Sequence, residues 1–378
     1  MASICGSPVC AGGKPKLKFT YTGDYVVRDD GVVELRSTGT LVFIDPAVID
    51  VFMVGGGGKG GRCVMTNSAA YYTARGGGGG GYTRTLKRLA VQGSYEINIG
   101  AGSTAASVDG GSTAWGSAYT VLGGKSASEA PSAPTAAGPG MAGGSGGGGA
   151  VISNSDYGTG GSDGNSGEQG YFGTVAGGAG QGFTTREFGE ATGKLYAGGG
   201  GGGRYMVSQT PIVSNGGAGG GGTGGWAGSS SGQLQAPAAG GANTGGGGGG
   251  AAANYSGGMQ GGSGGSGIVC FRDAAELPEL AGTWVLNERL YAPENDISEN
   301  ISFTATTPTL PADTRTCTAV SVSTQYVSIK PSTANWITAY NILVNKWINK
   351  YQTWTFPAGA TASDEFRAWL ASNATKQA

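Results

Sequence analysis

Residues 49–81 read IDVFMVGGGGKGGRCVMTNSAAYYTARGGGGGG, a stretch that joins an apolar run to two glycine islands. The apolar run is typical of a buried strand. The islands, residues 55–61 and 76–81, carry almost no side chains that a hydrophobic core needs. Outward from this stretch, 72 of the 80 glycines lie between residues 55 and 267. The structure that these islands take therefore decides the fold of the middle of the chain.

The composition of the 378 residues argues against an ordinary globular enzyme. Glycine is about three times its usual share of roughly 7%. Leu, Ile, Val and Phe together number 62, which is fewer than a conventional core requires. Charged residues make up only 12% and the net charge is -1, so repulsion between charges cannot keep the chain open. Something other than side-chain burial must hold much of this chain together.

Several classes of function lack the residues that they need. The chain has no histidine, which excludes serine triads, Cys-His dyads and histidine-ligated metals within it. Phosphate-loop and nucleophile-elbow patterns occur only as accidents of polyglycine, and no cofactor is expected. The pI near 5.6, without a basic stripe, predicts no nucleic-acid partner. The five cysteines form no metal-binding pattern; a Cys5–Cys10 disulfide stays open.

The N-terminal sequence bears on where the protein is made. It has neither the basic region nor the apolar region of a signal peptide, and no stretch approaches the roughly 20 apolar residues of a membrane span. We expect synthesis in the cytoplasm, no export by the usual signal and no membrane insertion.

Short strands frame the glycine islands. Alternating apolar and polar residues between turn signals predict strands at 17–21, 25–28, 32–36, 40–44, 48–54, 82–91, 95–99, 119–122 and 268–271. Their spacing is typical of a sandwich or barrel. We expect a jelly-roll-like β-sandwich that is closed by a strand from beyond the glycine-rich insert.

The glycine islands have two interpretations. One is a flexible linker. The other is a bundle of polyglycine II helices, extended helices with three residues per turn that leave every N–H and C=O group free to pair with a neighbour. The islands are similar in length, which favours the bundle.

The segments between the islands are rich in Ser, Thr, Asn and aromatic residues, a composition of adaptable recognition loops. Each aromatic side chain is equally well explained as a cap that covers the glycine backbone at the end of an island. The candidate receptor-binding residues are Tyr71, Tyr72, Tyr157, Tyr171, Phe172, Tyr196, Tyr205, Trp226 and Tyr255.

Two acidic groups are weaker candidates. Asp156, Asp163, Asn165 and Glu168 offer oxygen ligands for calcium, but their spacing fits no known calcium loop, so a solvated loop is the default. Glu187 and Glu190, or Asp163, are the candidates for a glycan-cleaving carboxylate pair, for which a charged surface is the simpler explanation.

After residue 272 the composition returns to that of a conventional domain. We divide the chain into an N-terminal arm (1–16), the sandwich with its insert (17–272), a linker (273–281) and a small α+β module (282–378). Within the module we expect strands at 284–287, 301–305, 319–329, 338–344 and 351–356. A helix from Thr361 or Ser363 to about Ala374 follows them. The fold class is mainly β.

Four junctions carry a resemblance to a known family. They are Ile49-Asp50-Val51-Phe52-Met53-Val54 into Gly55–Gly58, Gly76–Gly81 into Tyr82-Thr83-Arg84-Thr85, Tyr95-Glu96-Ile97-Asn98-Ile99 into Gly100-Ala101-Gly102, and Gly264-Gly265-Ser266-Gly267-Ile268-Val269. Together they resemble the glycine-rich domain of bacteriophage tail-fibre and receptor-binding proteins, over residues 17–272. The stretch from Trp284 to Lys376 is similar to modules appended to phage structural proteins.

The resemblance implies a polyglycine II lattice that presents loops to the host surface. The implied protein is a virion adhesin without enzymatic activity. Its partners would be a bacterial surface glycan or protein and other virion proteins; its oligomeric state, a trimer among the options, stays open. The alternative is a capsid decoration or head-fibre protein that contacts no receptor.

Overall fold

The computed structural model describes most of residues 17–286 and short segments beyond them. Up to residue 286 the described residues are 17–63, 73–128, 137–152, 156–157, 182–206, 214–230, 232–254, 257–274, 277 and 279–286. Beyond it they are 303–304, 309–310, 315–316, 318–319, 326–327, 353–356, 367, 370–371 and 374–377. The chain divides into two compact units, residues 1–274 and 275–378, and its fold is mainly β.

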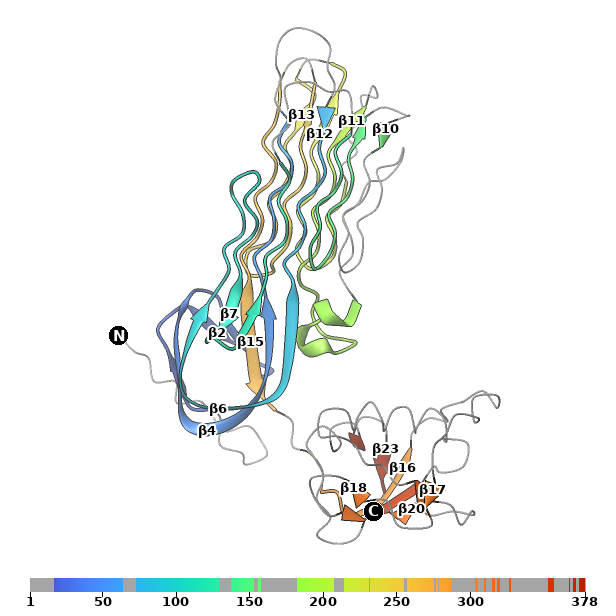
Figure 1. Ribbon diagram of the computed structural model, residues 1–378. Helices are drawn as coiled ribbons and strands as arrows, with labels where there is room; N and C mark the ends of the chain where they lie inside the picture. Colours follow the sequence, from blue (N-terminus) through green and yellow to red (C-terminus); the bar gives the residue numbers. More distant parts are fainter. Residues whose placement is uncertain are drawn as a thin grey trace. The chain divides into compact units, whose positions relative to one another are not determined.

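An eight-stranded antiparallel sheet forms the base of the first unit (Figure 1). Its strand order is β2-β3-β15-β4-β6-β7-β8, with β1 paired to β4. The strands are β1 (Phe19–Tyr21), β2 (Tyr25–Val27), β3 (Val33–Leu35), β4 (Gly39–Val54), β6 (Thr83–Asn98), β7 (Thr113–Trp115), β8 (Tyr119–Val121) and β15 (Ile268–Asp273). As expected, β15 closes the sheet from beyond the glycine-rich insert.

Two long strands fold this sheet onto itself. The sequence predicts 40–44 and 48–54 as separate strands, and likewise 82–91 and 95–99, but each pair forms one bent strand. The pairing of β4 with β6 shifts register between Phe43 and Ala47, and Gly93 in β6 has a φ of 78°. The first half of β4 pairs with β1, whereas its second half pairs with β15. Each long strand therefore contributes to both layers of the sandwich.

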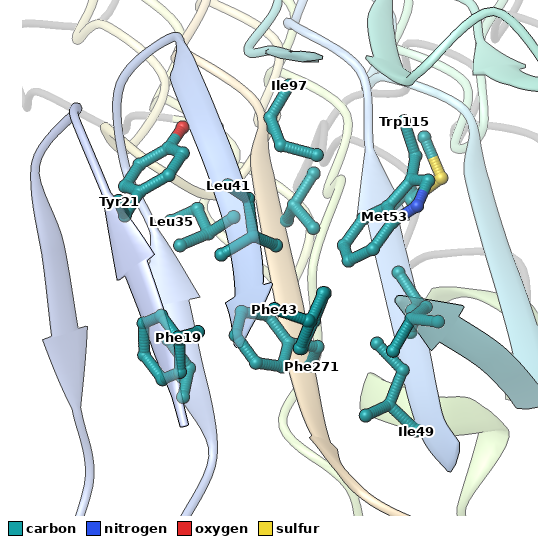
Figure 2. Close-up of a cluster of buried hydrophobic side chains, with 14 of the residues drawn as sticks. Phe19, Tyr21, Leu35, Leu41, Phe43, Ile49, Met53, Ile97, Trp115 and Phe271 are labelled. Carbon is teal, nitrogen blue, oxygen red and sulfur yellow. The ribbon is translucent and has the colours of Figure 1, made fainter. Parts of the chain in front are cut away.

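Phe271 lies at the centre of the core between these layers (Figure 2). Its ring centroid is 5.3 Å from that of Phe19, 5.7 Å from Phe43 and 6.1 Å from Trp115. Figure 2 also shows Tyr21, Leu35, Leu41, Ile49, Met53 and Ile97 around it. Trp115 comes from β7, a strand that the sequence analysis did not predict. This core anchors the chain where it enters and leaves the glycine-rich part.

The glycine islands are packed rods, extended segments whose hydrogen bonds repeat every third residue. The amides of Gly55, Gly58 and Gly61 donate to carbonyl groups of the rod at 74–82. The amides of Gly57 and Gly60 donate instead to the rod at 259–267. Successive residues thus face different neighbours, as in the threefold polyglycine II helix. A flexible linker would show no such order, so the bundle interpretation is correct.

The rod at 74–82 is surrounded on all sides. Its amides donate to three rods, which span 122–127, 144–151 and 245–252. Its carbonyl groups accept from three others, which span 55–63, 137–142 and 197–204, and Gly80 also accepts from Gly144. This arrangement satisfies backbone groups that would otherwise be buried without partners. Hydrogen bonds between main chains therefore replace the side-chain core that the composition lacks.

Close approach of the rods is what requires glycine. A Cβ atom added to Gly77 would lie 2.1 Å from the carbonyl oxygen of Gly200, and one added to Gly248 would lie 1.9 Å from that of Gly262. Both distances are far inside van der Waals contact. Any side chain at these positions must push two rods apart.

Side chains return where a rod faces solvent, again at every third residue. The rod at 122–128 exposes Leu122, Lys125 and Ser128. In the rod at 259–267, Gln260 is exposed, and Ser263 and Ser266 are half-buried. The chain has no overall Gly-X-Y period, but this local spacing marks the outer rods.

Two small sheets lie at the end of the rods away from the eight-stranded sheet, which we call the far end (Figure 1). One has the order β10-β9-β11-β12-β13 and the other pairs β14 with β5. Their bounds are β5 (Thr73–Ala74), β9 (Val151–Ile152), β10 (Asp156–Tyr157), β11 (Arg204–Met206), β12 (Trp226–Gly228), β13 (Leu234–Gln235) and β14 (Ala252–Ala253). The one short helical region of this unit is η1 (Gly182–Thr185) and η2 (Glu187–Gly189), within its described residues.

The second unit contains a four-stranded antiparallel sheet of order β20-β22-β16-β23 and two strand pairs, β17–β21 and β18–β19. The strands are β16 (Gly282–Leu286), β17 (Phe303–Thr304), β18 (Thr309–Leu310), β19 (Arg315–Thr316), β20 (Thr318–Ala319), β21 (Tyr326–Val327), β22 (Thr353–Phe356) and β23 (Ala374–Lys376). Arg367, Leu370 and Ala371 are helical. Ala374, where the sequence analysis ends the helix, instead begins β23, and the strand expected at 338–344 lies outside the described residues.

Candidate functional site

The far end of the rods gathers the varied segments of the chain. Three pairs of described residues lie at this end, on either side of a varied segment: Cys63 and Thr73, Ser128 and Ala137, and Met206 and Ser214. Three turns at the opposite end, 142–144, 217–219 and 241–245, are short and consist mostly of glycine and alanine, whereas residues 182–197 there form a longer segment that packs on the sheet. The two ends of the bundle therefore differ in chemistry, and the far end is the candidate site.

Three of the candidate aromatic residues are buried, Tyr205 and Trp226 at the far end and Tyr196 at the opposite end. Tyr196, Tyr205 and Trp226 are 0%, 1% and 3% exposed. Tyr205 on β11 packs with small side chains of neighbouring rods, such as Ala227 and Ala252. The capping alternative fits Tyr205 and Trp226, which follow directly on glycine rods, whereas Tyr196 packs against side chains of the sheet. Because these three side chains are buried, they cannot serve as surface contacts for a receptor.

The other candidate aromatic residues lie beyond what the structure can test. Tyr157 belongs to β10, of which only the backbone is described. The remainder fall outside the described residues: Tyr71, Tyr72, Tyr171, Phe172 and Tyr255.

Tyr196 belongs to the opposite end, where residues 182–197 cover the outer face of the sheet. Its ring centroid lies 5.3 Å from that of Phe52, and its hydroxyl group donates to Oε1 of Glu187 at 3.2 Å. Burial raises the pKa of the Tyr196 hydroxyl far above its ordinary value, with further contributions from Cys270 and Glu187. Tyr196 is therefore a neutral anchor of this segment.

The two glutamates considered for glycan cleavage form ion pairs on the same face. Both carboxylate oxygens of Glu187, which is 4% exposed, accept hydrogen bonds of 2.8 Å from Arg28. Glu190 pairs with Arg272 and Lys87. A carboxylate neutralised by a bidentate arginine is poorly suited to act as a nucleophile or an acid. These residues fasten η2 to the sheet. They form a partly buried ion-pair cluster and not the exposed charged surface that the sequence suggests.

The calcium candidates receive no structural support. Asp156 lies in β10, where side chains are not described, and Asp163, Asn165 and Glu168 fall outside the described residues. Within the described ranges, no three acidic or cysteine side chains gather as a metal site would require. Nor is any helix there long and apolar enough to cross a membrane.

Sequence reasoning missed one polar residue at the far end. Asn254, which is fully buried, donates from its side-chain amide to the carbonyl oxygen of Gly228 at 2.7 Å. Weaker bonds run to the carbonyl groups of Ser230 at 3.2 Å and Gln233 at 3.3 Å. An asparagine between glycine islands carries no local signal for this role, because its partners lie more than twenty residues away.

Comparison with known proteins adds one finding. The sequence model of a family described as a glycine-rich domain matches residues 36–273. The matched span begins in the sandwich and ends with β15. No curated protein matches the chain.

Proposed function

The chain belongs to the glycine-rich domain family over residues 36–273, and from this premise we propose that it is a bacteriophage tail-fibre adhesin. In this proposal the protein is part of the virion and is made in the host cytoplasm. The rods hold recognition loops at their far end, and these loops bind a glycan or protein on the bacterial surface. The protein carries out no chemical reaction.

The separation of the two ends carries the proposal. A bundle held by main-chain hydrogen bonds needs only short turns, such as 217–219 and 241–245 at the sheet end. The far-end connections, among them 64–72 and 207–213, are longer and richer in varied side chains. Loops that carry function are usually positioned by a rigid scaffold, as in antibody domains.

Rigidity supports the same function. Each inner rod is bonded to several neighbours, so the far end is held by a network and not by single contacts. Preorganised contact surfaces lose less entropy on binding than mobile ones. A scaffold of this kind lets the loop sequences change while the fold is kept.

Cell binding by the purified full chain tests the proposal. The labelled protein is incubated with a panel of bacterial strains, and the bound fraction is measured for the wild type and for variants in which 207–213 or 64–72 is replaced by Gly-Ser sequence. We expect saturable binding to some strains and at least a tenfold loss in one replacement, with an unchanged circular dichroism spectrum. Lys125→Ser, on the flank of the bundle, is the matched control and should bind normally.

Two outcomes would overturn the adhesin proposal. Wild-type protein that binds no strain would favour the alternative, a decoration or head-fibre protein, whose position on the virion an antibody label would show. Binding that survives every loop replacement would place the contact elsewhere on the protein.

A further inference from the structure

Two turns at the far end share one buried side chain. The first turn joins β12 to β13 and is described at 228–230 and 232–233; the second follows β14 and is described at Asn254 and Gly257. In the second turn the Asn254 and Gly257 main chains bond to each other in both directions, at 3.2 Å. The Asn254 side chain leaves this turn and reaches three carbonyl groups of the first one.

The geometry fits an amide and not another side chain of the same size. Three carbonyl oxygens converge on the Asn254 Nδ2 atom, which supplies two N–H donors. A carboxylate at this position would face those oxygens with a like partial charge. An apolar side chain would take the amide donor from the buried carbonyl group of Gly228, which is destabilising, whereas the carbonyl groups of Ser230 and Gln233 would keep their main-chain donors.

A second contact joins the same two turns. A Cβ atom added to Gly257 would lie 3.2 Å from the Cδ1 atom of Leu234, so the main chain of the second turn sits against the first residue of β13. The first turn is closed by its own bonds: Ser230 donates its main-chain N–H to Oε1 of Gln233 at 3.1 Å. Each turn is thus closed internally, while Asn254 and Leu234 link them.

We propose that Asn254 is a positioning residue that fixes these two turns as one composite contact surface. The proposal rests on the adhesin function for its biological meaning. The described side chains of this surface are uncharged and polar apart from Leu234, namely Ser229, Ser230, Gln233 and Gln235. Hydroxyl and amide groups of this kind suit hydrogen bonding to a neutral, hydroxyl-rich ligand such as an uncharged glycan.

Hydrogen exchange of the full chain, followed by mass spectrometry, tests the link. In Asn254→Ala we expect exchange to accelerate by about tenfold or more in both 228–233 and 254–257, because both turns lose the shared side chain. Gln233→Ala should accelerate exchange in the first turn only. Asn98→Ala, which removes a similar amide–carbonyl bond of 2.8 Å in the sandwich, should leave both turns unchanged.

Acceleration in one turn alone in Asn254→Ala would overturn the proposal. If that variant does not fold, Leu234→Ala serves instead, since it removes the second contact from a half-buried position; unchanged exchange in 254–257 would then refute the link. Cell binding of the same variants separates this inference from the adhesin function. Wild-type protein that binds no strain contradicts the adhesin function but leaves the exchange result to decide on the link. Exchange that changes in both turns without loss of binding would refute their role as the contact surface.

Discussion

Replacement of one rod glycine by alanine should destabilise the lattice, whereas replacement of the preceding residue of the same rod by alanine should be tolerated. In Gly264→Ala the new Cβ atom would lie 1.9 Å from the carbonyl oxygen of Gly57, on the adjacent rod. Contacts of this kind below 3.0 Å essentially never occur. The two rods must therefore separate by about 1 Å.

That separation sets the magnitude. The hydrogen bonds between these rods, from Gly57 to Gly265 at 2.8 Å and from Gly60 to Gly262 at 2.9 Å, would stretch beyond useful length. Each buried group left without a partner costs about 1–3 kcal/mol. The lower entropy of the unfolded alanine chain offsets about 0.4–1 kcal/mol of this. We expect a net loss of about 2–5 kcal/mol in the free energy of unfolding.

Chemical denaturation followed by tryptophan fluorescence measures this loss. Ser263→Ala is the matched control, because Ser263 is the preceding residue of the same rod and is half-buried; its effect should stay within about 0.5 kcal/mol. Equal midpoints for the two variants, or a Gly264→Ala protein as stable as the wild type, would refute the packing argument.

Other predictions concern the outer face of the sheet and the buried thiols. Burial of the Glu34 carboxyl raises its pKa, but the hydrogen bonds from Arg36 and Arg28 and the charges of Lys194 and Arg36 together outweigh this and leave the pKa below its ordinary 4.5. Its stabilising contribution is therefore complete above pH 4.5 and is lost as the pH falls through the lowered pKa; Glu34→Gln should flatten acid unfolding in that range. Arg28→Ala strips both hydrogen bonds from the buried carboxylate in η2 and should cost about 3–5 kcal/mol, with faster hydrogen exchange in 182–197 while the rods stay protected. Burial raises the pKa of the Cys63 thiol to about 11 and that of Cys270 well above its ordinary value, so neither should react with iodoacetamide at pH 8 until the protein is unfolded, as site-resolved mass spectrometry would show.

The strands of the sandwich were largely predictable, since alternation and turn residues mark them. What local patterns could not show is that 40–44 and 48–54 continue as one strand, because the bend depends on partners in β1 and β15. β7 was missed because its three residues, centred on Ala114, lie within the glycine- and serine-rich stretch 110–117, where no alternating run marks a strand.

The rods were predictable as a class but not in their arrangement. Glycine has no side chain that could specify a partner, so the neighbours of Gly77 cannot be read from its sequence. The exposed flanks did carry a signal: in Gly261-Gly262-Ser263-Gly264-Gly265-Ser266 the half-buried serines recur every third residue and mark the outer face. This spacing is a search pattern for the outer rods of similar chains.

Candidate site residues were harder to predict, for a physical reason. Tyr196 and Trp226 lie in segments whose composition is that of recognition loops, but both rings are buried. Aromatic rings serve both in binding and in packing, and the sequence alone cannot distinguish the two roles. The role of Asn254 depends on a turn that is distant in sequence. Composition identified the varied segments between the islands, whereas their position in the fold and their individual contacts required the three-dimensional structure.

The central claim is that main-chain hydrogen bonds between glycine rods form the rigid support of the far-end loops. Site-resolved hydrogen exchange of the amides at 75–82 and 245–251 tests it most directly. The account predicts protection comparable to that of β4 and β15 in the sandwich core, because these amides are buried and bonded to neighbouring rods. Exchange at the rate of an unstructured chain in both segments would contradict it.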